Sequence, residues 1–248
     1  NQISLRKFIV TAGASASAVF LKGCFGNPPD SNGTTQSTAT NQPVANISAE
    51  QAPEVNGVKL GYIPIVEAAP LIIAKEKGFF AKYGMTGVEV LKQSSWGTTR
   101  DNLVLGSQNN GIDGAHILSP MPYLISTGAM TANNQPVPMS ILARLNLSGQ
   151  CISVGKEYAD LKLDVNAKGF KEALAAKKAS GKTVNAAVTF PGGTHDLWMR
   201  YWLSAAGIDP NKDISTIVVP PAQMVANMKV GNMDTFCVCE PWNEQLIN

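Results

Sequence analysis

From Val58 onward, short apolar segments alternate with longer segments in which apolar residues recur every three to four positions. The short segments predict β-strands and the longer ones predict helices, most of which end at a glycine. The predicted strands are 58–65, 88–93, 112–118, 137–145, 151–155, 184–190, 215–220 and 233–239. The predicted helices are 68–84, 98–108, 169–179, 195–207 and 222–231. This alternation predicts an α/β fold with mainly parallel sheets.

The pattern also contains a weak internal duplication. The order strand, corner, long helix, glycine, strand in 58–91 recurs in 184–219, and a proline follows seven residues after both Asp113 and Asp234. Two similar α/β lobes in tandem imply a cleft between them. Ligands of open parallel sheets bind beyond the carboxyl ends of the strands, so we expect the site at these corners.

Composition divides the chain into four parts. In 1–24, the basic pair Arg6-Lys7 precedes an apolar stretch that is too short to span a membrane but is typical of a signal peptide. Its end, 21–24, resembles a lipobox, in which Cys24 would carry the lipid anchor. The Ser/Thr/Asn/Pro-rich run 25–57 predicts a flexible tether and argues against a buried N-terminal helix. Lobe 1 is then expected over 58–147 and lobe 2 over 148–248.

Charge and cysteine content exclude several functions. The formal net charge is +2 and the lysines are scattered, so no nucleic-acid partner is expected. Apart from Cys24, the cysteines are Cys151, Cys237 and Cys239, an odd number at irregular spacing that predicts neither a disulfide framework nor a metal site. Packing is the expected role of these three residues.

The strand-to-helix corners supply the candidate site. His195 follows Gly192-Gly193-Thr194 where a helix begins, and Trp96 lies in a corner rich in Ser, Gly and Thr. Helix N-termini present N–H groups that suit an anion, and the same dipole disfavours a protonated imidazole. We therefore predict that His195 is a neutral hydrogen-bond donor. Trp198 and Trp202, four residues apart on one helix, are predicted to pack in the core.

The order of these corners resembles the substrate-binding lipoproteins of cyanobacterial-type nitrate/nitrite and bicarbonate ABC importers. The likeness covers nearly the whole chain. It includes KLGYIPIVEAAPLIIAKEKGFFAKYGM, TRDN, GIDGAHIL, PMPYL, AAGIDP and VPPA. That family has a two-lobed, type II periplasmic-binding-protein fold, which continues well beyond the PW at 241–242. The resemblance therefore implies that this chain is C-terminally truncated, with lobe 2 incomplete and its return to lobe 1 missing.

The resemblance also implies a ligand set and a cellular setting. In the nitrate branch, an indole, a glutamine amide and an imidazole surround the oxyanion, which by position would be Trp96, Gln150 and His195. A lysine from the later half would complete the set. The implied partners are nitrate or nitrite, the permease and ATPase subunits, and the membrane through Cys24, at the periplasmic face. No cofactor and no metal are implied.

Three positions separate the nitrate branch from its relatives. The bicarbonate branch has a TQGNG-like segment in place of 147–151, an asparagine–glutamine pair in place of 194–195, and GGQW in place of the stretch that ends at His116. At all three the sequence resembles the nitrate branch. A bicarbonate- or sulfonate-binding relative is the alternative within the family.

Two other classes remain as alternatives. An enzyme similar to the thiamine-pyrimidine synthases would need a substrate lysine and a cysteine-rich iron segment, for which Cys237-Val238-Cys239 is a poor substitute. A regulatory domain fused to a transporter ATPase would be cytoplasmic, which the lipoprotein-like N-terminus disfavours. We therefore expect a binding protein and not an enzyme.

Overall fold

The computed structural model describes residues 45–147 and 149–248, and their strands form two sheets. The predicted signal segment, Cys24 and most of the predicted tether lie outside these residues. The described residues all belong to one compact unit. Within them, no helix is long and apolar enough to cross a membrane.

The first sheet has the order β2-β1-β3 and is entirely parallel, while the second has the order β4-β7-β5-β6 with only β4 antiparallel to its neighbour. The strands are β1 (Lys59–Tyr62), β2 (Glu89–Lys92), β3 (Gly114–Ala115), β4 (Gln150–Val154), β5 (Asn185–Val188), β6 (Ser215–Val218) and β7 (Thr235–Cys239). The α/β class with mainly parallel sheets is therefore confirmed.

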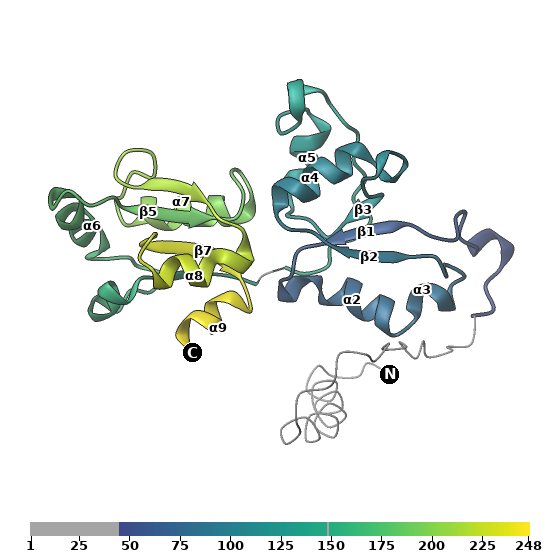
Figure 1. The fold of residues 1–248 in the computed structure, drawn as a ribbon, viewed down its shortest axis with the longest axis horizontal. Helices are drawn as coiled ribbons and strands as arrows, with labels where there is room; N and C mark the ends of the chain where they lie inside the picture. The colour runs from purple at the N-terminus through teal and green to yellow at the C-terminus, as the bar shows by residue number, and fades with distance from the viewer. Residues whose placement is uncertain (1–44, 148) are drawn as a thin grey trace, which may run out of the picture. The chain divides into compact units, whose positions relative to one another are not determined.

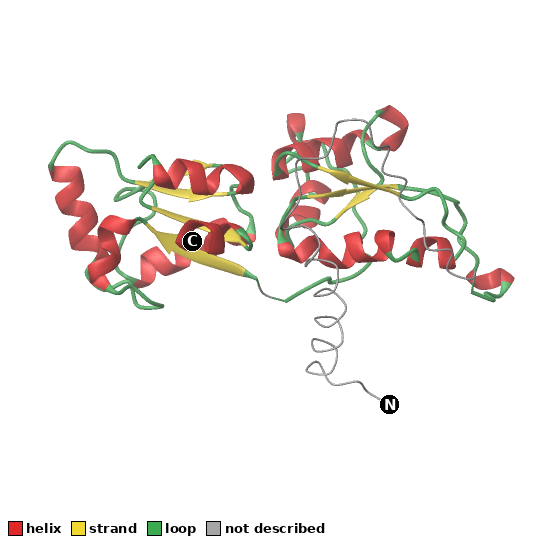
Figure 2. Ribbon diagram, turned by 60° about the horizontal axis from the view of Figure 1, so that its bottom comes forward, coloured by secondary structure: helices red, strands yellow, loops and turns green. Residues whose placement is uncertain are grey.

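Helices flank both sheets. The α-helices are α2 (Ala69–Glu76), α3 (Phe79–Lys82), α4 (Trp96–Leu105), α5 (Pro120–Ser126), α6 (Phe170–Ala179), α7 (Thr194–Ala205), α8 (Met224–Lys229) and α9 (Trp242–Ile247). The 3₁₀ turns are η1 (Ala49–Gln51), η2 (Val66–Ala68), η3 (Ser107–Asn109), η4 (Ala132–Asn134), η5 (Lys156–Leu161) and η6 (Pro221–Gln223). Around the first sheet, α2 and α3 cover one face and α4 and α5 the other (Figures 1 and 2).

Strand β7 is buried along its whole length because helices cover both of its faces. On one face, Cys237 packs in a cluster with residues of α6 and α7; on the other, Phe236 and Val238 pack with residues of α8 and α9. A strand covered on both faces is apolar at consecutive positions, and this accounts for the run from Phe236 to Cys239. Cys237 and Cys239 share one face, and Cys239 belongs to a third cluster at the end of the strand.

Two predicted elements differ in the structure. The single helix expected over 68–84 is split into α2 and α3, because Gly78 adopts a left-handed conformation with φ of 70° that interrupts the helix. The strand expected over 137–145 does not form. Its apolar residues alternate suitably, yet no neighbouring strand hydrogen-bonds to it in the described chain, and Leu142 is 95% exposed. An apolar pattern alone does not make a strand, which also needs a ladder partner.

Hydrogen bonds join the segments that follow β1 and β7. The backbone N–H of Val66 donates to the carbonyl oxygen of Glu240 at 2.8 Å. The indole N–H of Trp242 donates to the carbonyl oxygen of Pro64 at 3.2 Å. The carboxyl ends of the central strand of the first sheet and of a central strand of the second are thus connected directly.

Candidate functional site

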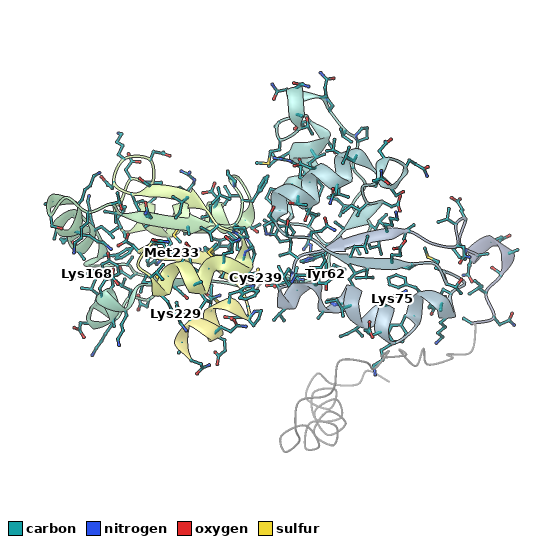
Figure 3. The ribbon with its side chains drawn as sticks, viewed as in Figure 1. Tyr62, Lys75, Lys168, Lys229, Met233 and Cys239 are labelled. Atoms are coloured by element: carbon teal, nitrogen blue, oxygen red, sulfur yellow. The ribbon has the colours of Figure 1, made fainter. Side chains whose placement is uncertain are left out.

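The three predicted ligand residues all lie near the ends of strands. Trp96 is the first residue of α4, which follows β2; His195 is the second residue of α7, which follows β5; and Gln150 is the first residue of β4. Because β4 runs antiparallel to β7, Gln150 pairs in register with Cys239, the last residue of β7. Figure 3 labels Cys239 at this end of β7 and Met233 at the other. Gln150 is therefore located at the carboxyl ends of the parallel strands, as the site requires.

Trp96 is fully buried, and its position follows from the start of α4. The Ser95 hydroxyl caps the helix by accepting the N–H of Thr98 at 3.0 Å, which fixes the first turn. The indole packs in a cluster that also contains residues after β1, β3 and β5 and the last residue of β7. These residues are Ile63, Ile65, Leu118, Met121, Phe190 and Cys239. Among the described residues, no group accepts a hydrogen bond from the Trp96 Nε1–H, although this atom is buried.

His195 is also fully buried, but both of its ring nitrogens have partners. Nδ1 lies 2.9 Å from the Thr189 hydroxyl and Nε2 lies 3.1 Å from the Cys239 Sγ. Burial lowers the pKa of the imidazole to about 4, so it is neutral at pH 7. Burial thus accounts for a neutral imidazole, and the role of His195 as a hydrogen-bond donor to a ligand stays a prediction.

At the start of α7, the side chain of Asp196 supplies a negative charge. The Asp196 carboxylate accepts the N–H of Gly192 at 2.8 Å and pairs with the Nε of Arg200 at 2.7 Å. Negative charge is favourable at a helix N-terminus, and here Asp196 supplies it. The N–H of Gly192, part of the corner expected to receive an external anion, is therefore engaged internally.

Cys239 connects the predicted residues. It contacts His195, pairs in register with Gln150 and belongs to the same cluster as Trp96. Residues paired across a β-ladder project from the same face, so the side chain of Gln150 lies on the face that carries Cys239. The structure thus brings Trp96, Gln150 and His195 to one neighbourhood around this thiol.

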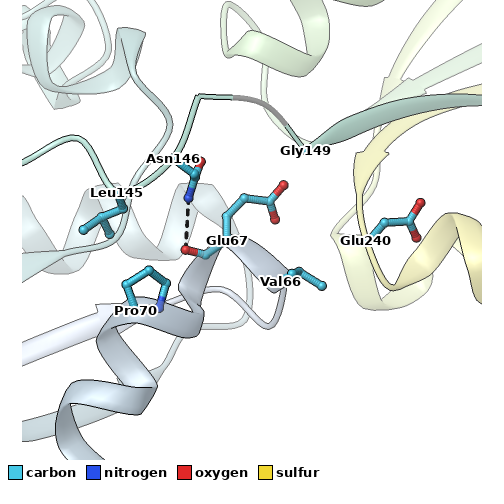
Figure 4. Close-up of a pocket in the computed structure, with 7 residues that line it drawn as sticks. All are labelled: Val66, Glu67, Pro70, Leu145, Asn146, Gly149 and Glu240. Atoms are coloured by element: carbon cyan, nitrogen blue, oxygen red, sulfur yellow. Dashed lines mark hydrogen bonds between the residues drawn. The ribbon is translucent and has the colours of Figure 1, made fainter. Parts of the chain in front are cut away.

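Sequence reasoning did not identify Glu67 as part of this neighbourhood. Glu67 lines a cavity of about 300 Å³ with Val66, Pro70, Leu145, Asn146, Gly149 and Glu240 (Figure 4). Its backbone carbonyl accepts the side-chain N–H of Asn146 at 3.1 Å, and its buried Oε2 has no partner among the described residues. Burial raises the pKa of this carboxyl, an effect that hydrogen bonding by the Cys239 thiol partly offsets.

His116 is a second residue missing from the predicted ligand set. It directly follows β3, is 8% exposed, and its ring centroid lies 5.6 Å from that of Trp96. Its Nδ1 is buried without a partner in the described part of the chain. Burial lowers the pKa of this imidazole too, to about 4. The sequence signal that could have revealed it is its place directly after a strand of the parallel sheet.

Two predictions about packing have different outcomes. Trp202 is partly buried against the α6–α7 cluster and its indole N–H donates to the Asp164 carbonyl at 3.0 Å, as packing predicts. The prediction for Trp198 is wrong, because its side chain is 57% exposed. Positions four apart share a helix face only approximately, and the buried face of α7 is centred instead on Met199 and Leu203.

The packing role predicted for the three cysteines holds for two of them. Cys237 and Cys239 are buried, whereas the prediction for Cys151 is wrong, because this residue is exposed on the edge strand β4. Burial raises the pKa of the Cys237 thiol to about 12, so it stays protonated at neutral pH. Within 45–147 and 149–248, no group of three or more His, Cys, Asp or Glu side chains is arranged to hold a metal ion.

Two mainly parallel β-sheets, flanked by helices and with buried hydrogen-bonding groups at their strand ends, define a fold of the periplasmic-binding-protein class. The sequence profile of the NMT1-like family matches residues 51–248. The chain belongs to the NMT1-like family.

Known proteins resemble the chain over nearly all of its length. The nitrate/nitrite binding protein NrtA of Synechococcus elongatus is 56% identical over 248 residues, which is 100% of this chain and 56% of that protein. The bicarbonate-binding protein CmpA of the same species is 46% identical over 246 residues, 98% of this chain and 53% of that protein. The chain thus spans about half the length of the curated relatives it matches.

A solved structure supports the same fold. The crystal structure of the periplasmic nitrate-binding protein NrtA from Synechocystis PCC 6803 superposes with a TM-score of 0.75 at 63% sequence identity. The superposition covers 79% of this chain and 50% of that structure. The predicted resemblance to this group of binding proteins is therefore confirmed.

Proposed function

We propose that the chain belongs to a solute-binding protein that captures nitrate or nitrite for an ABC importer. The observation that carries the proposal is the Trp96 indole N–H, which is buried, unpartnered within the described chain and located at the carboxyl end of a parallel sheet. The likeness to proteins named for nitrate binding, which exceeds the likeness to the bicarbonate-binding relative, supports the choice of ligand.

The chemistry of the neighbouring groups suits this ligand. Nitrate is a weakly basic, planar monoanion, so neutral N–H donors can bind its oxygens without a proton being transferred. Trp96 and Gln150 would donate from the indole and the amide, and His195 is neutral at physiological pH. To donate to the anion, the His195 ring would exchange its contact with either Thr189 or Cys239 for one with nitrate. Exclusion of water around the ligand would strengthen each of these bonds.

The proposed cellular setting follows from the sequence. Residues 1–24 would direct export, Cys24 would carry the lipid anchor, and 25–57 would tether lobes at 58–147 and 148–248 to the periplasmic face of the membrane. Permease and ATPase subunits of the importer would be its partners. The described end of this segment contacts the first lobe, because the N–H of Ala45 donates to the carbonyl of Lys82, the last residue of α3, at 2.7 Å.

The test is a tryptophan-fluorescence titration with sodium nitrate, nitrite and bicarbonate. The protein used runs from residue 25 to its natural C-terminus. We expect saturable changes with nitrate and nitrite only. Trp96→Phe should weaken nitrate binding by about tenfold to a hundredfold, the cost of losing a hydrogen bond to a charged ligand.

Trp198→Phe is the matched control, because Trp198 is exposed on α7 and outside the proposed site. Its nitrate affinity should equal that of the unsubstituted protein. Saturation with bicarbonate alone would replace the proposal with the bicarbonate-binding alternative. If neither fluorescence nor calorimetry detected binding of any of the three anions, capture of nitrate, nitrite or bicarbonate would be excluded.

A further inference from the structure

His116 and Trp96 form a pair of buried rings at the carboxyl end of the first sheet. Trp96 begins α4 after β2, and His116 follows β3; these two strands flank the central strand β1. The backbone N–H of His116 donates to the carbonyl of Gly61 in β1 at 2.9 Å, which fixes its main chain to the sheet. The ring centroids lie 5.6 Å apart, with the ring planes inclined by 54°.

Both rings carry a buried nitrogen that has no partner among the described residues. Trp96 is 0% exposed and His116 is 8% exposed, and neither Trp96 Nε1 nor His116 Nδ1 makes a hydrogen bond within 45–147 and 149–248. A buried polar atom is nearly always paired, because leaving it unpaired forfeits its hydration without compensation. Two such atoms on adjacent rings at the ligand-binding edge of a parallel sheet point to one missing hydrogen-bonding group.

His195 differs from His116 in this respect. Both ring nitrogens of His195 already have neighbours, the Thr189 hydroxyl and the Cys239 thiol. Of the two buried imidazoles, His116 is the one that has an unused ring nitrogen in this structure. An arriving acceptor could therefore bind it without breaking an existing bond at Nδ1.

We propose that His116 donates its Nδ1–H to the bound oxyanion and, with Trp96, forms the half of the anion site contributed by the first sheet. This inference rests on the proposed function. The indole and imidazole rings, 5.6 Å apart, would supply two neutral N–H donors to two oxygens of one planar anion. Because burial keeps the imidazole neutral, it offers the anion a hydrogen bond and no net positive charge. Such a donor favours weakly basic oxyanions, and His116 thereby contributes to specificity.

The first test is calorimetric titration of the natural full-length protein with sodium nitrate. His116→Phe keeps a ring against Trp96 but removes both nitrogens, and should weaken binding at least about tenfold. His116→Gln restores an amide donor and should bind more tightly than His116→Phe. Tyr158→Phe is the matched control: it too removes hydrogen-bonding capacity from a buried aromatic residue, but in η5, away from the first sheet, where its hydroxyl donates to Asp234. Its nitrate affinity should stay within about twofold of the unsubstituted protein.

A second measurement, nitrogen NMR of the unsubstituted protein, tests directly whether nitrate contacts His116. In ¹⁵N spectra of histidine-labelled protein, the Nδ1 resonance of His116 should shift on saturation with nitrate. Binding by His116→Phe within twofold of the unsubstituted protein, or an Nδ1 resonance that does not move, would overturn the inference and leave the proposed function intact. Absence of nitrate binding by the unsubstituted protein would overturn both.

Discussion

The Asp234 carboxylate accepts the backbone N–H of Asn185 at 2.8 Å, joining the start of β7 to the start of β5. The Asn185 carbonyl accepts the N–H of Asp234 in return, also at 2.8 Å. The first sheet repeats this pair of bonds with Asp113 and Lys59, at 2.8 Å and 2.9 Å. The duplication suggested by the spacing of Asp113 and Asp234 thus has a structural counterpart at the amino-terminal edge of each sheet.

The two aspartates should differ in their effect on stability. The Asp234 side chain is buried, and its carboxylate also binds Lys177 at 2.6 Å and the Tyr158 hydroxyl. Asp234→Asn should therefore lower the free energy of unfolding by about 3 kcal/mol, the cost of breaking a buried ion pair. Asp113 is exposed, so Asp113→Asn should cost less than about 1 kcal/mol. Urea unfolding followed by circular dichroism measures both, and equal losses would contradict this account.

Stability should fall as the solution is acidified from pH 6.5 to pH 4. The pKa values of His116 and His195 are lowered from 6.5 to about 4, so the unfolded chain binds more protons in this range. The stability associated with the neutral rings is present above pH 6.5 and is lost as pH falls through the folded pKa. At one pKa unit per ~1.4 kcal/mol, each ring accounts for about 3 kcal/mol. Urea unfolding at a series of pH values measures the loss.

Variants separate the groups responsible for this pH dependence. His195→Gln should flatten the dependence by about half, because it removes one of the two rings. Glu67→Gln should steepen it. Burial raises the pKa of Glu67, so its protonation favours the folded state and opposes the histidines as pH falls. A pH dependence that is the same in all three proteins would refute the assignment to these residues.

Gly149 should be intolerant of a side chain. Its φ is +144°, and a Cβ at this position would lie 1.9 Å from the Glu67 Oε1. Gly149→Ala should therefore lower the free energy of unfolding by about 2–3 kcal/mol through backbone strain and this clash. Combining it with Glu67→Ala removes the clash and leaves the strain, so the double variant should recover part of the loss. Strictly additive effects in this double-mutant cycle would show that the two residues do not interact.

The sequence predicted most strands and the parallel sheets because their apolar runs are bounded by turn residues. The strand at 137–145 was wrongly predicted because its pattern says nothing about a pairing partner. The short helices α5 and α9 were missed, since six or seven residues are too few to establish a helical period. Gly78 could be recognised as a helix stop, but not that the second helix, α3, begins at the very next residue.

The sequence predicted where the candidate site lies, but not which side chains contact one another within it. Corner chemistry and the family resemblance selected Trp96, Gln150 and His195, and the structure groups them around Cys239. The roles of Cys239 and His116 depend on which rings and strands come into contact, and a single sequence does not contain that information. Trp198 illustrates the same limit, because helical spacing alone does not say which face of α7 is buried.

The bond from Val66 to Glu240 connects main-chain atoms only. Any non-proline residue at position 66, and any residue at position 240, carries the atoms that form it. Side chains around the strand ends can therefore diverge, exchanging one anion preference for another, without altering the chemical groups that form this junction. Relatives that differ in ligand can inherit the same connection between their sheets, and selection on specificity can act on the surrounding residues independently of it.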